Sequence, residues 1–134
     1  MSYNLSSGAC FSLQMHLVLV TKYRRKVINA DLLKRLEQIF HATVMKWECR
    51  IVEFNGEADH IHLIIDYNPK VQISKFVNNL KTVSSRLIRK EFAATLDAVY
   101  SKPVFWTGAY FVASCGGVTV EQLKAYVQSQ DNPT

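Results

Sequence analysis

The sequence predicts an α+β fold, a ferredoxin-like βαββαβ sandwich whose antiparallel sheet carries two helices on one face. Three observations predict it. Short segments rich in apolar residues read as four strands, two longer segments between them keep helical spacing, and a further helical segment follows the last strand at 118–130. The 134 residues suit a single domain over 1–134, with 1–10 as a flexible or extended N-terminal arm. The second face of the sheet is left free for a site or ligand.

The first half of the chain predicts a strand, a helix and a strand pair. The first strand is expected over 11–21 and runs into a basic loop over 22–26. Asn29 is placed to cap a helix with one apolar stripe, made of Leu32, Leu33, Leu36, Ile39, Phe40, Val44 and Trp47. Strands are expected over 50–54 and 60–67, and the turn-like Asn55-Gly56 between them predicts an antiparallel pair.

The second half predicts the remaining three elements. Helical spacing of apolar residues indicates a long second helix that contains Ile73, Phe76, Val77, Leu80, Val83, Leu87 and Ile88. A fourth strand is expected over 110–114. The Gly116-Gly117 pair then interrupts the chain, and Thr119 with Gln122 three residues later is typical of a capping box. This predicts the last helix, which carries Tyr126.

Composition indicates an ordinary globular chain. It is 49% hydrophobic and 20% charged, without an apolar run long enough to cross a bilayer or a start typical of a secretory signal. We therefore expect a cytoplasmic protein with no membrane partner. Cys10, Cys49 and Cys115 are too scattered for a metal or redox motif and are expected to be reduced thiols. The net charge of +5 permits a polyanionic partner without requiring one.

The stretch Asp59-His60-Ile61-His62-Leu63 is the most informative one for chemistry. Alternate residues of a strand point to the same side, so His60 and His62 project together from the free face of the sheet. Neutral imidazole is a common ligand of divalent metals, which predicts the beginning of a metal site. Taken alone, such a pair is more often two histidines that are merely hydrogen-bonded or exposed.

Tyr126 and Gln130 lie four residues apart in the last helix, on one side of it. A tyrosine at such a position usually serves packing. If the helix covers the free face of the sheet, however, Gln130 can offer a metal ion an oxygen while Tyr126 points at the substrate. Neutral ligands would leave the full charge of magnesium or manganese available as a Lewis acid for phosphodiester chemistry. Attack by the tyrosine on a DNA phosphate would give a phosphotyrosine and a free 3′-hydroxyl.

Basic and aromatic residues indicate contact with nucleic acid, because cations hold phosphates and aromatic rings stack on unpaired bases. The alternative is a solvated charged loop and a tryptophan in the core. The candidate DNA-binding residues are Lys22, Tyr23, Arg24, Arg25, Lys26, Lys81, Ser85, Arg86 and Trp106.

Over nearly its whole length the chain resembles the small single-tyrosine, HUH-class transposases of bacterial and archaeal insertion sequences (TnpA-type, IS200-like). Ordered blocks carry the resemblance: HLV at 16–18, TKYRRKV at 21–27, DHIHL at 59–63, FV at 76–77, LK at 80–81, SSR at 84–86, FW at 105–106, YFV at 110–112, GGV at 116–118 and YVQSQ at 126–130. Ala58 and Ala109 depart from the family pattern, and Ala109 bears on DNA contacts.

The resemblance implies that Tyr126 is the nucleophile, which forms a 5′-phosphotyrosine, and that His60, His62 and Gln130 bind the metal. It further implies a homodimer that recognises subterminal hairpins and cuts single-stranded DNA, in which Tyr126 of one subunit can serve the histidine pair of the other.

Three other functions compete with this interpretation. A rolling-circle replication initiator or relaxase uses the same chemistry, usually in a larger chain, and a domesticated transposase would act on palindromes without moving an element. A non-catalytic module like the RNA recognition motif shares the strand and helix order. Such a module needs aromatic residues on its sheet, so His60 and His62 argue against it.

Overall fold

The computed structural model describes residues 4–6, 9–11, 13–114 and 120–130. Its main sheet has the antiparallel strand order β4-β5-β3-β6. The strands are β3 (Gln14–Val20), β4 (Arg50–Glu57), β5 (His60–Asp66) and β6 (Phe111–Ser114). This order and the two long crossover helices are those of a ferredoxin-like sandwich, so the predicted fold class is confirmed.

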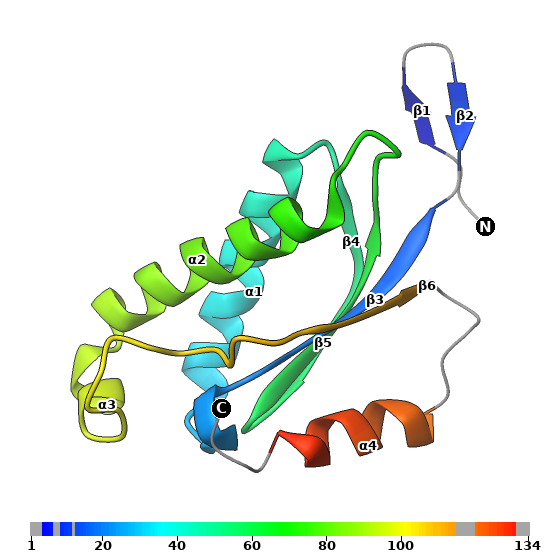
Figure 1. The fold of residues 1–134 in the computed structure, drawn as a ribbon. Coiled ribbons are helices and arrows are strands. Elements are labelled where there is room, and N and C mark those ends of the chain that lie inside the picture. The colour runs from blue at the N-terminus through cyan, green and yellow to red at the C-terminus, as the bar shows by residue number, and fades with distance from the viewer. Residues whose placement is uncertain (1–3, 7–8, 12, 115–119, 131–134) are drawn as a thin grey trace.

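The helices lie on both faces of this sheet (Figure 1). α1 (Ala30–Lys46) and α2 (Ile73–Glu91) pack side by side on one face, and α4 (Val120–Ser129) lies across the other. The short helix α3 (Ala93–Asp97) follows α2 and was not anticipated from the sequence. Among the described residues, no helix is both long and apolar enough to cross a membrane.

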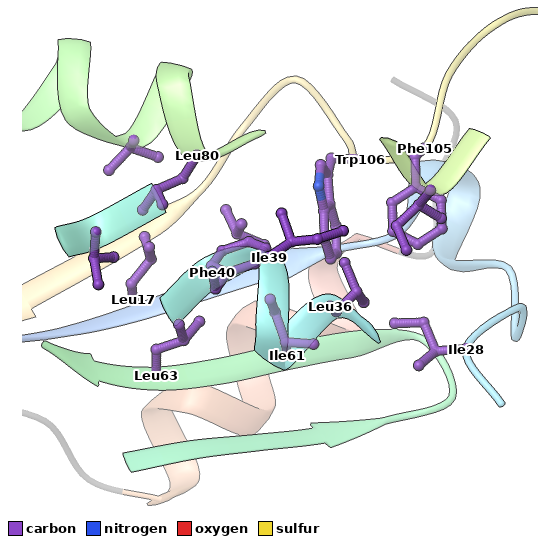
Figure 2. Close-up of a cluster of buried hydrophobic side chains, with 14 of the residues drawn as sticks. Leu17, Ile28, Leu36, Ile39, Phe40, Ile61, Leu63, Leu80, Phe105 and Trp106 are labelled. Carbon is purple, nitrogen blue, oxygen red and sulfur yellow. The ribbon is translucent and has the colours of Figure 1, made fainter. Parts of the chain in front are cut away.

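The main core fills the space between α1, α2 and the sheet. Asn29 begins α1 as predicted, because its side-chain oxygen accepts a hydrogen bond from the Leu32 backbone N–H at 2.9 Å. Leu36 and Phe40 then pack against strand residues such as Leu63 (Figure 2). These side chains are fully buried. The alternating apolar residues of the strands and the helically spaced apolar residues of α1 therefore face the same core.

The turn between β4 and β5 is not at Asn55-Gly56, where the sequence placed it. Strand β4 continues to Glu57, which pairs with His60, and only Ala58 and Asp59 form the loop. Gly56 has a packing role instead, because a Cβ there would collide with the Leu33 side chain of α1. The glycine therefore marks a close approach of helix and sheet. Because the loop is at Ala58 and Asp59, His60 stands at the start of β5.

The N-terminal segment pairs with itself, since β1 (Asn4–Ser6) and β2 (Ala9–Phe11) form a two-stranded antiparallel sheet. The first strand of the main sheet consequently starts at Gln14, later than expected. The predicted glycine break and capping box at 116–119 lie outside the described residues, and α4 is described from Val120.

Candidate functional site

The histidine pair lies on the face of the sheet that α4 covers. On this face, Val18 and Val20 of β3 pack with Val127 of α4, and Leu123, Tyr126 and Phe111 surround them. Strand pairing places Val18 opposite His62 and Val20 opposite His60, so both imidazoles emerge beside this small apolar cluster. The expectation that the last helix covers the histidine face agrees with this arrangement.

A cleft of about 510 Å³ opens between the histidines and α4. The strand pair and its loop supply His60, His62 and Asp59 to its wall. Basic side chains stand at its edge, and the residues that complete the lining are Val18, Arg24, Lys26, Glu57, Ala58, Leu123, Lys124, Val127 and Gln128. The cleft thus combines imidazole nitrogens with cationic side chains, a combination suited to an anionic ligand and a divalent cation.

His60 is oriented by a carboxylate. Its Nδ1 lies 2.8 Å from Oδ1 of Asp59, and Oδ2 of the same carboxylate accepts a hydrogen bond from Nε of Arg24 at 2.8 Å. Burial alone would raise the pKa of Asp59, but the hydrogen bonds with His60 and Arg24 outweigh it, so this pKa is lowered. Asp59 is therefore held as a carboxylate that directs Nε2 of His60 toward the cleft, as carboxylates do for metal-binding histidines.

His62 contacts another histidine that the sequence had not singled out as a site residue. Its Nε2 lies 2.8 Å from Nδ1 of His16 on the neighbouring strand β3. Burial lowers the pKa of His62, and the nearby His16 lowers it further. The ring of His62 is therefore kept neutral, which is the form that binds metals.

Tyr126 and Gln130 lie beside the cleft without lining it. The ring of Tyr126 packs against Phe111, with centroids 5.4 Å apart, and its hydroxyl is buried without a hydrogen-bond partner among the described residues. Burial raises the pKa of this phenol. The Gln130 side-chain oxygen accepts a hydrogen bond from the Thr107 hydroxyl at 3.3 Å. Within one chain, Tyr126 and Gln130 therefore line no part of the histidine cleft.

The basic loop beside the cleft has an unusual backbone. Lys22–Arg24 forms a short 3-10 turn, with Tyr23 and Arg24 at positive φ values of 58° and 55°. Arg25 and Lys26 are exposed, whereas Arg24 is engaged with Asp59. The loop thus offers charge to solvent and also reaches the histidine site.

The other predicted DNA contacts lie on or near α2. Lys81 is half-buried and donates a hydrogen bond to the Gly108 carbonyl at 3.0 Å, while Arg86 is exposed. Ser85 and Arg86 line another cleft together with Lys81. Trp106 is only 7% exposed, and its indole N–H donates to the buried Ser84 hydroxyl at 3.0 Å. Trp106 thus has a core role, the alternative that the sequence left open, and it also lines this second cleft.

The donors at the site fit a divalent cation in part. His60 and His62 line one cleft, but Gln130 is directed at Thr107. In the described part of the chain, no three His, Cys, Asp or Glu side chains converge on one point. A bound ion would therefore need a further ligand, such as Gln130 after a change of position, a residue of a second chain, or a substrate oxygen.

Sequence reasoning missed the roles of two neighbours of the histidine pair. His16 belongs to the block HLV at 16–18. The available signal was that His16 is polar and lies on the same face of its strand as Val18 and Val20, which is the face of the histidine pair. Asp59 directly precedes His60, but only the folded loop shows that its carboxylate holds both His60 and Arg24.

A ferredoxin-like sheet with a histidine pair beneath a helix that carries a tyrosine defines a candidate nucleic-acid-processing enzyme. Residues 9–130 match the family model described as "Transposase IS200 like". That match covers most of the chain, and the protein therefore belongs to the IS200-like transposase family.

Known proteins of this family are similar over most of their length. The transposase for insertion sequence element IS200 of Salmonella typhimurium is 30% identical over 115 residues, covering 86% of this chain and 74% of the relative. The ISDra2 transposase TnpA of Deinococcus radiodurans is 24% identical over 123 residues, with 92% and 87% covered.

Solved structures share the fold. A crystal structure of a protein assigned as a transposase from Deinococcus radiodurans superimposes with a TM-score of 0.86 at 25% identity, covering 95% of this chain and 97% of that one. A REP-associated tyrosine transposase bound to a REP hairpin superimposes with a TM-score of 0.58 at 9% identity, covering 92% and 68%, and at this identity shows the fold alone.

Proposed function

We propose that this transposase is metal-dependent and cleaves and rejoins single-stranded DNA at hairpin ends of an insertion sequence, with Tyr126 as the nucleophile. The observation that carries the proposal is the cleft in which His60 and His62 lie beneath α4, the helix that bears Tyr126. The family membership supports it. The REP-associated transposase, which shares the fold, is itself bound to a hairpin.

The chemistry is a pair of phosphoryl transfers. The Tyr126 oxygen attacks the scissile phosphorus as the bond to the 3′-oxygen breaks, which leaves a 5′-phosphate on the tyrosine and a free 3′-hydroxyl. Rejoining reverses these steps with a different 3′-hydroxyl. The phenol must lose its proton during attack, and burial disfavours that loss, so Tyr126 has to leave its present packing before it reacts.

The histidine pair and Gln130 would hold a magnesium or manganese ion. The bound ion would supply Lewis-acid stabilisation of charge on the scissile phosphate. His60 is prepared for this role because Asp59 fixes its ring and Arg24 fixes Asp59. Arg24 thereby links the basic loop to the site, so a phosphate bound at the loop would lie close to the histidines.

The basic residues would position the DNA strand. Arg25 and Lys26 are exposed at the loop, and Lys26 also lines the cleft. Lys22 and Tyr23 of the same loop would add to this contact. Lys81, Ser85 and Arg86 would extend it along α2, where all three border a second cleft. Such contacts neutralise phosphates and fix the position of the strand without reading its sequence.

We further propose that the working form is a homodimer with shared sites. Tyr126 and Gln130 do not line the cleft of their own chain, although Leu123, Lys124, Val127 and Gln128 of the same helix do. A second chain that supplies α4 could present the opposite side of the helix to His60 and His62. Each of two equivalent sites would then combine residues of both chains.

The decisive experiment uses single-stranded oligonucleotides that carry the hairpins flanking the gene. We expect a protein–DNA adduct that survives denaturing electrophoresis, requires magnesium or manganese, and is absent with Tyr126→Phe. Tyr67→Phe, a change at another half-buried tyrosine, is the matched control and should leave the adduct intact. An adduct in the Tyr126→Phe protein or in excess chelator would refute the proposal.

A further inference from the structure

The contact between His16 and His62 has a specific geometry. The ring planes differ by 11°, and the centroids are 5.1 Å apart while the facing nitrogens are 2.8 Å apart. The difference between these two distances is about twice the distance from the centre of an imidazole ring to one of its atoms. The two rings therefore meet edge to edge in nearly one plane. This is the geometry of a hydrogen bond from one ring nitrogen to the other, not of one ring lying over another.

The strand register gives this contact a direction. On β5, the partner of His16 is Ile64, whereas Val18 pairs with His62 and Val20 with His60. His16 therefore lies beside the part of β5 that continues beyond His62, on the side away from His60. A hydrogen bond to His16 turns Nε2 of His62 in that direction. Two ligands of one ion must instead point at a common position, about 2 Å from each nitrogen.

We propose that His16 is a positioning residue that holds the His62 ring in a resting orientation, so that His62 must release His16 before it joins His60 at a divalent cation. This inference rests on the metal site proposed above. It does not depend on which ring carries the shared proton. If the proton is on His62, Nε2 has no lone pair, and if it is on His16, the lone pair of His62 is occupied.

His16 therefore competes with the metal for one nitrogen atom. Removing its nitrogens while filling the space of its ring should strengthen metal binding. A hydrogen bond inside a protein typically shifts an equilibrium by a factor of about two to ten, and the gain in affinity should have this size. A histidine that only filled space, or one that itself bound the ion, would not give that result.

The test measures manganese binding to the metal-free full-length chain from the electron paramagnetic resonance signal of free Mn²⁺. His16→Phe should bind about two- to tenfold more tightly than the unmodified chain. His16→Gln, whose amide can replace the hydrogen bond, should return toward the original affinity. His41→Phe is the matched control, because His41 is exposed on α1, and it should change nothing. Unchanged or weaker binding by a folded His16→Phe protein would overturn the proposal.

A second measurement needs no substitution at His16. The chain has four histidines, so their ring nitrogens can be assigned by nuclear magnetic resonance. We expect a nitrogen–nitrogen coupling across the hydrogen bond in metal-free protein, lost at saturating Mg²⁺. A coupling that persists with the ion bound would overturn the proposal.

His62→Ala separates this inference from the function on which it rests. Manganese binding that survives His62→Ala would refute the proposed metal site itself. Binding lost in His62→Ala but unaltered in His16→Phe would refute only the role of His16.

Discussion

Replacing Tyr126 with phenylalanine should remove activity and leave the protein more stable. The Tyr126 hydroxyl is buried and has no hydrogen-bond partner among the described residues, while its ring packs on Phe111. A buried polar group without a partner typically costs about 1–3 kcal/mol. Because Tyr126 is only partly buried, we take the lower limit, and Tyr126→Phe should raise the free energy of unfolding by about 1 kcal/mol.

Tyr100 provides the matched comparison for this change. Its hydroxyl donates to the Lys22 carbonyl at 2.8 Å, and burial raises its pKa to about 12. Tyr100→Phe deletes that hydrogen bond and should lower the free energy of unfolding by about 1 kcal/mol. Urea denaturation followed by circular dichroism would give both values, which should differ by about 2 kcal/mol. A Tyr126→Phe protein destabilised as much as Tyr100→Phe would show that the hydroxyl is satisfied and the reasoning wrong.

Four further predictions address the site and its surroundings. His60→Ala or His62→Ala should abolish metal-dependent cleavage but largely retain hairpin binding in a gel-shift assay. Arg25→Ala should weaken DNA binding and reduce the slope of log affinity against log salt concentration by about one phosphate contact. Arg24→Ala, which releases Asp59, should mainly impair cleavage. Equal salt slopes for the two variants would contradict this division of roles. Mixing Tyr126→Phe with His62→Ala chains under conditions of verified subunit exchange should restore some cleavage if sites are shared, and none otherwise. Arg35 hydrogen-bonds Glu91 and lowers the pKa of the Glu91 carboxyl in the folded protein. This exposed pair therefore stabilises the fold at pH values above the pKa that Glu91 has in the unfolded chain, and the effect is lost as pH falls through the lower pKa of the folded protein. In thermal unfolding, Arg35→Ala should cost less than about 1 kcal/mol at pH 7 and nothing near pH 2.

Periodicity was sufficient to predict most of the fold. Apolar spacing in α1 and α2 and alternation in β5 each report on burial against one core, and all three elements were located from these patterns. Asn29 was identified as the cap of α1 because capping depends on a residue type and its immediate neighbours. Such features are local in sequence, and a single chain displays them directly.

Features that depend on distant segments were not predictable in the same way. Asn55-Gly56 resembles a tight turn, yet Gly56 lies within β4, where it pairs with Ile61 and Leu33 of α1 packs over it. Trp106 looked equally suited to a base and to the core until Ser84 was found to receive its indole N–H. In each case the deciding contact comes from a residue more than 20 positions away in the sequence.

Three groups of the proposed chemistry are held in contacts that the proposed working site would have to release. His62 is bonded to His16, Gln130 to Thr107, and the Tyr126 ring packs on Phe111. Two of these contacts depend on α4, whose apolar packing is confined to a small cluster around Val18 and Val20, whereas α1 and α2 share the large core. Elements that bury little apolar surface separate from a fold at the lowest cost in free energy. Displacement of α4 would therefore free Tyr126 and Gln130 together while the histidine sheet stays intact, which is what exchange of this helix between two chains requires.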